Sequence, residues 1–352
     1  MIKPILLTCA VLLAADTRLA TDYSADKGFK VEFETTLSMK TTSMSMERDG
    51  EPVEGRGGFG GGGSTSVRKG VFVDKVAAAA EGKPTKLTRA FESLAGSTTM
   101  LRGEEETTRD LEPPLSGVTL SLERAENGEV TAKVVDGTAP ADDAVLEGHR
   151  MELALDALLP SGEVADGASW ELDKDAVRSV LMLDAEKMLF PRPAPTEGEG
   201  GDRGQGGGGR PRGGFGGGGG ESRLLETAEW EAKATLSAES VEKNGVSCRV
   251  IEVELKAAGD MPEPQAGGGG GRRGQSLGME PASPLFGTTY KIELEGKLFF
   301  SAAEKRPVAF ELEGTLGQET DTEREGRDGS TMRIRSTREG AYKQTVAISR
   351  PQ

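Results

Sequence analysis

The chain has 352 residues, enough for two or three domains, and its formal net charge of −15 disfavours binding to nucleic acid or another polyanion. Its single histidine excludes metal sites built from several histidines, and its two cysteines exclude a disulfide framework. Three tracts, 55–63, 200–220 and 267–274, hold 27 of the 50 glycines. The composition therefore predicts folded segments joined by disordered glycine-rich linkers.

Residues 1–20 are predicted to be a signal peptide. Lys3 precedes an apolar run over 5–15, which is too short to span a membrane and is typical of the hydrophobic region of a secretory signal. We expect an exported protein, located in the periplasm, the cell envelope or outside the cell, with no transmembrane span in the mature chain. Cys9 leaves lipid attachment open as an alternative, and removal of the signal leaves Cys248 as the remaining thiol.

Residues 21–160 are predicted to form a β-rich lobe that contains the glycine-rich loop 55–63. Near its start, apolar and charged side chains alternate with a period of two, as in a strand with one face in water. The apolar face of this stretch consists of Phe29, Val31, Phe33, Leu37 and Met39. Long strands with one polar face indicate an antiparallel sheet.

Residues 161–191 depart from this alternation and are predicted to form a strand and the one substantial helix. From 174 to 190 the apolar residues recur at helical spacing, Asp173 is a suitable N-cap, and Pro191 ends the run. A helix with one apolar stripe needs a partner surface, so we expect it to cover a face of the sheet.

Residues 192–222 are predicted to be a disordered linker rich in glycine, arginine and proline. Its arginines at 203, 210 and 212 raise the alternative of a nucleic-acid-binding arm, because such arms combine positive charge with aromatic stacking partners. Acidic residues flank the glycine tract, and Phe215 is its one aromatic residue. We therefore favour a tether and expect no nucleic-acid partner.

Residues 223–352 are predicted to form a second β-rich lobe, with the glycine-rich loop 267–274. Asn244–Gly245 separates two alternating runs and is typical of a tight two-residue reversal. A second long strand presents the apolar face Tyr290, Ile292, Leu294, Leu298 and Phe300. The predicted fold class is mainly β, with long curved antiparallel sheets in a half-barrel or sandwich-like arrangement.

The sequence contains no constellation that predicts a catalytic, cofactor or metal site. We interpret His149 as a structural or solvated imidazole at the start of a strand, rather than a catalytic base. Cys248 lies by parity on the strand face opposite Ile251, beside carboxylates that disfavour a reactive thiolate. The acidic run 319–329 has the start of a calcium loop, but Met332 occupies the position that requires a bidentate acid.

Two stretches carry a resemblance to known proteins. The segments "LLPSGEVADGASWELD" (158–173) and "GKLFFSAAEKRPVAFELEGTL" (296–316) resemble exported bacterial β-rich proteins of unknown function, in which such strands are structural. The resemblance implies export and a β architecture, and no activity. The curved half-barrel of bacterial lipoprotein carriers is a looser architectural analogue.

These observations lead to a non-enzymatic envelope or extracellular protein as the first hypothesis. The apolar strand faces need more cover than one helix supplies, so we expect an apolar ligand or an envelope protein as the partner on a curved sheet. Two sheets packed face to face would explain the same pattern without a ligand. A scaffold module with glycine-rich tethers and a carboxylate-based hydrolase are the alternatives that remain.

Overall fold

The computed structural model describes residues 17–53, 62–191, 220–261, 285–325 and 329–351. These residues form one antiparallel sheet of 13 strands and a separate two-stranded sheet. No helix in these ranges combines the length and the apolar character that a membrane crossing requires.

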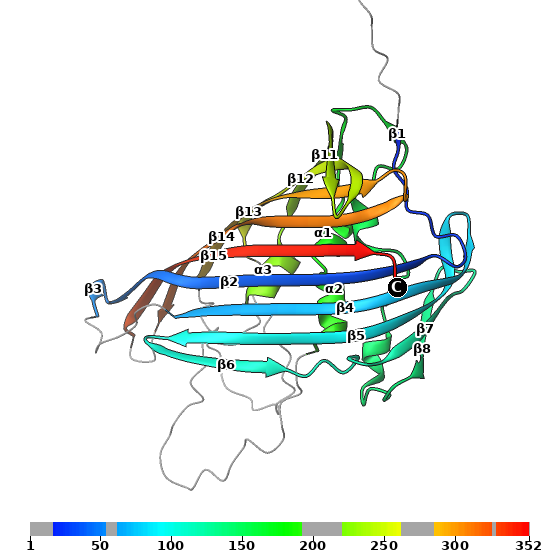
Figure 1. Cartoon of the computed structure of the whole chain (residues 1–352). Helices are drawn as coiled ribbons and strands as arrows, with labels where there is room; N and C mark the ends of the chain where they lie inside the picture. The colour runs from blue at the N-terminus through cyan, green and yellow to red at the C-terminus, as the bar shows by residue number, and fades with distance from the viewer. Residues whose placement is uncertain (1–16, 54–61, 192–219, 262–284, 326–328, 352) are drawn as a thin grey trace, which may run out of the picture.

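The large sheet contains most of the described residues (Figure 1). Its strands are β2 (Gly28–Arg48), β3 (Glu51–Pro52), β4 (Gly63–Ala80), β5 (Lys83–Arg102), β6 (Glu105–Leu111), β7 (Thr119–Arg124), β8 (Val130–Asp136), β10 (Ser169–Glu171), β11 (Trp230–Lys243), β12 (Val246–Asp260), β13 (Leu285–Ser301), β14 (Arg306–Glu325) and β15 (Thr331–Ser349). Their order across the sheet is β10-β11-β12-β13-β14-β15-β2-β4-β5-β7-β8, with β3 beside β2 and β6 beside β5. The small sheet pairs β1 (Thr17–Arg18) with β9 (Glu163–Val164).

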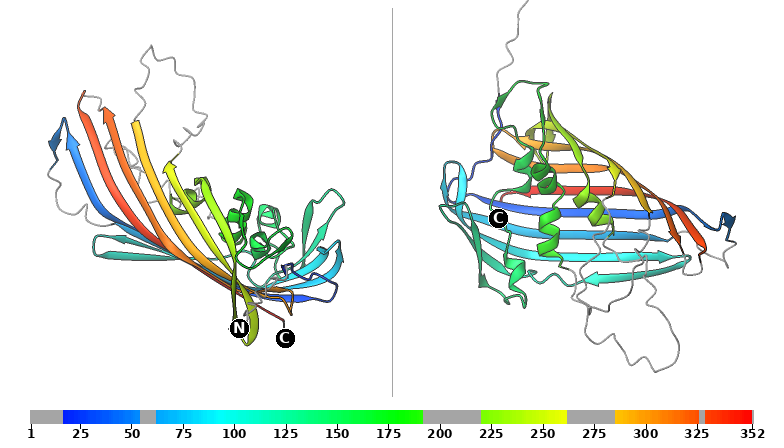
Figure 2. Two further views of the ribbon diagram at one scale, coloured as in Figure 1. Left: turned by 90° about the horizontal axis from the view of Figure 1, so that it is seen from above. Right: turned by 180° about the vertical axis from the view of Figure 1, so that it is seen from behind.

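The predicted fold class is confirmed: the protein is mainly β, with long antiparallel strands in a curved sheet (Figure 2). The strands of the predicted lobes 21–160 and 223–352 share this one sheet. Strand β15 pairs with β2 along nearly its whole length, with Val346 opposite Phe33. Alternation identifies the two faces of a strand but not the strand beside it. The sequence alone therefore could not predict this pairing of an N-terminal strand with a C-terminal one.

Three helices lie against the concave face of the sheet (Figure 2). The helix predicted over 174–190 is present as α1 (Lys174–Val180) and α2 (Leu183–Leu189). Leu181 and Met182 separate them, and Met182 has the left-handed conformation with φ of 55°. Asp173 is the N-cap, since its carboxylate accepts a hydrogen bond of 2.7 Å from the Ala176 amide. The third helix, α3 (Gly220–Thr227), begins within the last three residues of the predicted linker 192–222.

Two 3₁₀ turns complete the cover of the concave face: η1 (Asp143–Leu146) and η2 (Ala154–Leu158). The helices α1, α2 and α3 together with η1 and η2 are called the helical cover below. The predicted role of the helical region, covering a sheet face, is therefore confirmed, and the cover is larger than the one helix that the sequence predicted.

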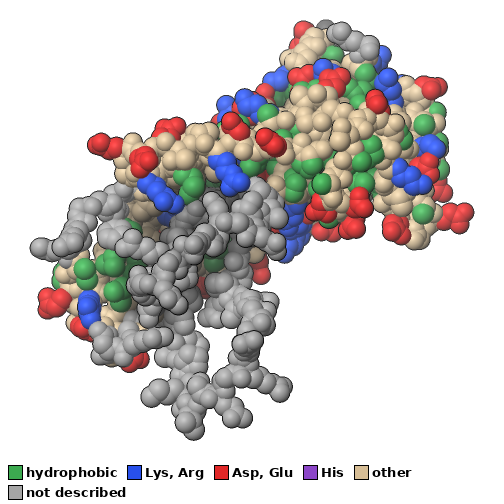
Figure 3. Space-filling view, turned by 90° about the horizontal axis from the view of Figure 1, so that it is seen from below, with side chains coloured by type: hydrophobic (Ala, Val, Ile, Leu, Met, Phe, Trp, Pro, Cys, Tyr) green, Lys and Arg blue, Asp and Glu red, His purple; other side chains and the backbone are tan. Residues whose placement is uncertain are grey.

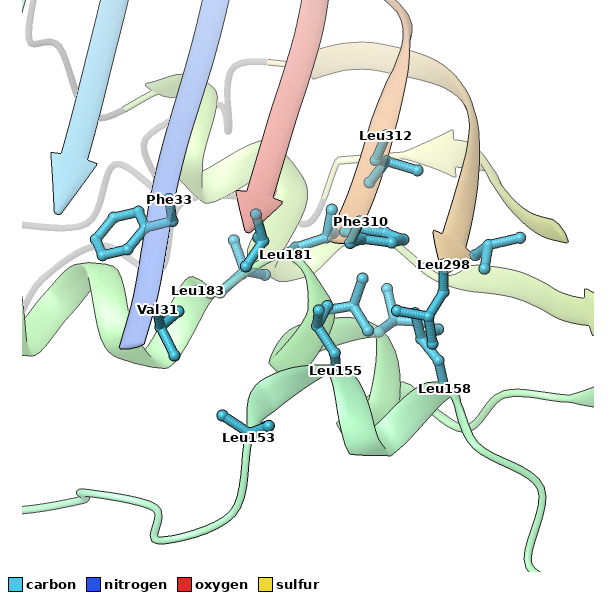
Figure 4. Packing of buried hydrophobic residues seen from close by; sticks show 14 of the residues in the cluster. Val31, Phe33, Leu153, Leu155, Leu158, Leu181, Leu183, Leu298, Phe310 and Leu312 are labelled. Atoms are coloured by element: carbon cyan, nitrogen blue, oxygen red, sulfur yellow. The ribbon is translucent and has the colours of Figure 1, made fainter. Parts of the chain in front are cut away.

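The strand face toward the helical cover is apolar and the opposite face is mostly charged, so acidic and basic side chains are spread over the molecular surface (Figure 3). Phe310 and Leu298, from neighbouring strands, lie across from Leu155 and Leu158 of η2 (Figure 4). These side chains belong to one continuous core. Cys248 lies outside it, buried in a small second cluster with Val250 and Phe299, as its parity predicted.

Glycine at two positions allows neighbouring strands to approach closely in this sheet. An added Cβ at Gly314 would overlap the Glu293 carbonyl of β13, and one at Gly340 would overlap the Ser38 carbonyl of β2. Both glycines face the core in the register of β14 and β15. Such positions favour bending of a sheet toward the face that carries no side chain.

Several predicted segments lie at the limits of the described residues. Thr17–Arg18 and Leu19, within the predicted signal peptide 1–20, pack on the rest of the protein, and Leu19 is 2% exposed. Of the glycine tract 55–63 only residues 62 and 63 are described, and the tract 267–274 and most of the linker 192–222 lie outside the described residues. The Asn244–Gly245 reversal is confirmed, with φ of 53° and 75° at its two residues.

Candidate ligand site beneath the helical cover

The ten residues of the two predicted apolar strand faces are all buried in the main core. They comprise Phe29, Val31, Phe33, Leu37, Met39, Tyr290, Ile292, Leu294, Leu298 and Phe300. None of the ten is more than 7% exposed. The structure therefore brings both predicted faces together in one core, in which Val31 also lines a cavity.

The cavity lies between the concave face of the sheet and the helical cover, and has a volume of about 100 Å³. Its apolar wall includes Val31, Phe72, Phe91, Leu189, Val346 and Ile348. Polar and charged residues also line it: Arg89, His149, Arg150, Glu152, Arg178, Ser179, Asp184 and Gln344. An engineered protein cavity of about 150 Å³ with a wholly apolar lining binds benzene. The space beneath the cover is therefore suited to a small ring or a short alkyl group.

His149 is a buried polar residue in the wall of this cavity. It is 4% exposed, and its ring centroid lies 6.3 Å from that of Phe91. Its Nε2 is 3.2 Å from the Val145 carbonyl oxygen, whereas its Nδ1 is buried without a hydrogen-bond partner among the described residues. One of the two ring nitrogens therefore has a hydrogen-bond partner, and the other has none among the described residues.

The location of His149 differs from the predicted strand. It follows η1, where the Asp142 carboxylate accepts a hydrogen bond of 2.9 Å from the Ala144 amide and starts a 3₁₀ turn. This turn places the Val145 carbonyl four residues before His149, within reach of its ring. A local cap thus determines the orientation of the imidazole.

The other buried polar groups of the wall are paired. Gln344 donates to the Val180 carbonyl at 2.9 Å and accepts from the Tyr342 hydroxyl at 2.8 Å. Arg89 donates to both carboxylate oxygens of Asp74, at 2.7 Å each. Among the described residues of the wall, His149 Nδ1 is thus the buried side-chain atom that lacks a partner.

A second buried polar cluster joins the N-terminal segment to η2. The Tyr23 hydroxyl donates to the Asp156 carboxylate, which also accepts from the Thr21 hydroxyl at 2.6 Å. The Leu153 amide donates to the Tyr23 oxygen at 2.6 Å. Burial raises the pKa of Asp156 to about 6, although these hydroxyl donors lower it.

Asp156 and His149 make opposite contributions to stability as the pH changes. The pKa of Asp156 is raised from 3.8 to about 6, so the folded protein binds this proton more tightly and its stability falls as the pH rises from 4 to 6. Burial, together with the positive charge of Arg89, lowers the pKa of His149 from 6.5 to about 4. The unfolded chain therefore binds this proton more tightly, and stability rises over nearly the same range.

We predict opposite pH slopes for the Asp156→Asn and His149→Phe variants, measured as differences from the wild type. Between pH 4 and 6, the Asp156→Asn difference in unfolding free energy should rise by up to about 3 kcal/mol, and the His149→Phe difference should fall by a similar amount. Urea unfolding at four pH values measures both, and the subtraction removes all other titrating groups. Parallel curves for wild type and variants would contradict the two assignments.

Comparisons with known proteins assign no family to the chain. No protein-family model matches it, and no curated protein matches it. It is similar to a solved structure concerned with lipid–protein interactions in lipovitellin, with a TM-score of 0.37 and 7% sequence identity. The match covers 94% of this chain and 26% of that chain, so the chain spans about a quarter of the length of that relative.

Proposed function

We propose that this protein is an exported, non-enzymatic binding protein that holds the apolar part of a small ligand beneath its helical cover. The observation that supports this function is the apolar cavity between the sheet and the cover. A concave, mostly apolar site with few polar groups is the usual form of a small-molecule site. Export is supported by the apolar run at 5–15 after Lys3.

The helical cover offers a way for the ligand to enter. Met182 and Met188, before and within α2, line the cavity and are half-buried. Methionine is unbranched and flexible, so it adapts to a ligand at small cost. A change in the side-chain rotamers of these two methionines would widen the cavity without moving the sheet strands.

Benzene binding tests the proposed function. We expect a dissociation constant on the order of 1 mM, which corresponds to a binding free energy of roughly 4 kcal/mol. The midpoint temperature of thermal unfolding should rise by about 1–3 °C at saturation. Ala185→Leu should abolish the shift, because Ala185 lines the cavity and a larger side chain fills it. Ala144→Leu, at an exposed position of η1, is the matched control and should bind normally.

Extraction of the full-length protein, followed by mass spectrometry, complements this test. We expect small apolar molecules to be recovered from the wild type and to be depleted from Ala185→Leu. The proposal is overturned if benzene leaves the wild type unchanged, or if Ala185→Leu responds to benzene as the wild type does.

A further inference from the structure

We infer that the ligand is a short aliphatic carboxylate, whose head group binds Arg150 and Arg178 and whose alkyl chain lies between the sheet and the helical cover. The inference rests on the proposed function, since it assigns the polar end of a ligand bound in the same cavity. It is based on the exposure and the pairing of the charged side chains in the cavity wall.

Part of the cavity wall is both charged and accessible to solvent. The side chains of Arg150, Asp184 and Arg178 are 51%, 38% and 23% exposed, and all three line the cavity. The apolar part of the wall, which includes Phe91 and Ile348, is buried. A ligand can therefore bury its chain while its head group stays in contact with water, which avoids most of the cost of burying a charge.

The exposed cluster contains two guanidinium groups and one carboxylate. Arg178 donates a hydrogen bond to the Asp184 carboxylate, and a nitrogen of Arg150 lies 3.6 Å from the second oxygen of that carboxylate. Arg150 also donates to the Ser179 hydroxyl. Among the described residues each of the two arginines donates from one nitrogen, although a guanidinium has five N–H groups. Further N–H groups are thus available for a second carboxylate, which arginine binds with two parallel hydrogen bonds.

The other charged groups of the wall are neutralised in pairs. Glu152 accepts a hydrogen bond of 2.7 Å from Arg124, and Asp74 pairs with Arg89 at the same distance. His149, whose pKa is lowered to about 4, adds no charge at pH 7. The described part of the wall therefore has one positive charge in excess, from the two arginines that share Asp184. A ligand with one negative charge compensates it, a neutral head group does not, and an ammonium ion would be repelled.

The volume of the cavity limits the length of the alkyl chain. A cavity of about 150 Å³ holds the six carbons of benzene, so one of about 100 Å³ holds roughly four. Pentanoate has a chain of this length beyond its carboxylate. Pentanamide has nearly the same shape without the charge, so the two molecules form a matched pair of probes.

NMR titration of the full-length protein at pH 7 and low ionic strength should give an affinity for pentanoate about tenfold greater than for pentanamide. Addition of salt should lower this ratio of affinities, because exposed charges are screened. The double variant Arg150→Gln/Arg178→Gln should bring the ratio to about one, since it removes both guanidinium groups. Asp184→Asn should raise the ratio, because it removes the competing carboxylate. Lys187→Gln, which removes a positive charge of α2 outside the lining, is the matched control and should keep the wild-type ratio.

The outcomes separate the inference from the proposed function. Because the ratio compares two probes in one protein, a general change in packing affects both affinities and cancels. Failure of benzene, pentanoate and pentanamide to bind would overturn the function itself. Benzene binding without a preference for pentanoate over pentanamide would overturn only the inference, as would a lower ratio in Asp184→Asn. If the double variant does not fold, the wild-type ratio and Asp184→Asn still decide the question.

Discussion

Replacement of Asp74 by alanine is expected to lower the free energy of unfolding by about 3–5 kcal/mol, because it leaves the Arg89 guanidinium buried without a counter-charge. The side chains of Asp74 and Arg89 are 2% and 10% exposed, and two parallel hydrogen bonds of 2.7 Å join them. Arg89 also lies over the ring of Phe72, 4.8 Å from its centroid. Urea unfolding at pH 7 measures the loss.

Two controls separate the buried charge from a general loss of packing. The double variant Asp74→Ala/Arg89→Met should recover most of the stability, because it removes both charges and keeps an apolar side chain against Phe72. Glu123→Ala breaks the exposed pair between Glu123 and Lys86 and should cost far less stability than Asp74→Ala, because solvent screens this pair. If the double variant is as unstable as Asp74→Ala, the explanation by an unpaired charge is wrong.

Period-two alternation predicted the strands and their faces well. The charged and apolar faces of 29–39 and 290–300 are where parity placed them, and Asn244–Gly245 forms the predicted reversal. The neighbours of each strand were not predictable, because pairing of β15 with β2 depends on contacts between residues some 300 positions apart. Local sequence carries no information on such contacts.

The region 143–158 shows where alternation misleads. Met151, Leu153 and Leu155 alternate as in a strand, yet Leu155 and Leu158 belong to a 3₁₀ turn. All four are buried in the main core. A short apolar run fits both the period of two of a strand and the period of three to four of a helical turn, so tertiary packing decides between the two structures.

The candidate site was less accessible to prediction than the fold. The sequence identified apolar faces, but of these ten residues Val31 lines the cavity and all ten are buried in the core. His149 was interpreted as structural or solvated, and its burial follows from the cap at Asp142 and the packing of η1. A cavity is the volume that packed elements leave unfilled, so no pattern along one strand reports it.

Phe310→Ala is the second large effect that the structure predicts, with a loss of about 3–5 kcal/mol in unfolding free energy. Phe310 is fully buried, and its neighbours across β14 are Leu298 of β13 and Val346 of β15. Truncation would leave a cavity beneath η2, where Leu158 faces the sheet (Figure 4). Glu311→Ala, one residue along and on the exposed face, breaks only a solvent-exposed ion pair with Lys243 and should change stability by at most about 1 kcal/mol.

The same pair of variants tests whether the two predicted lobes fold as one unit. In a single sheet, Phe310→Ala should lower the hydrogen-exchange protection of strands on both sides of the β15–β2 pair, including β5 around Phe91. Glu311→Ala should leave protection unchanged throughout. If Phe310→Ala lowers protection in β11–β15 while β4 and β5 keep theirs, the halves unfold independently despite the shared sheet. In that case the pairing of β15 with β2 joins two cooperative units, and packing in the core beneath the helical cover does not couple their unfolding.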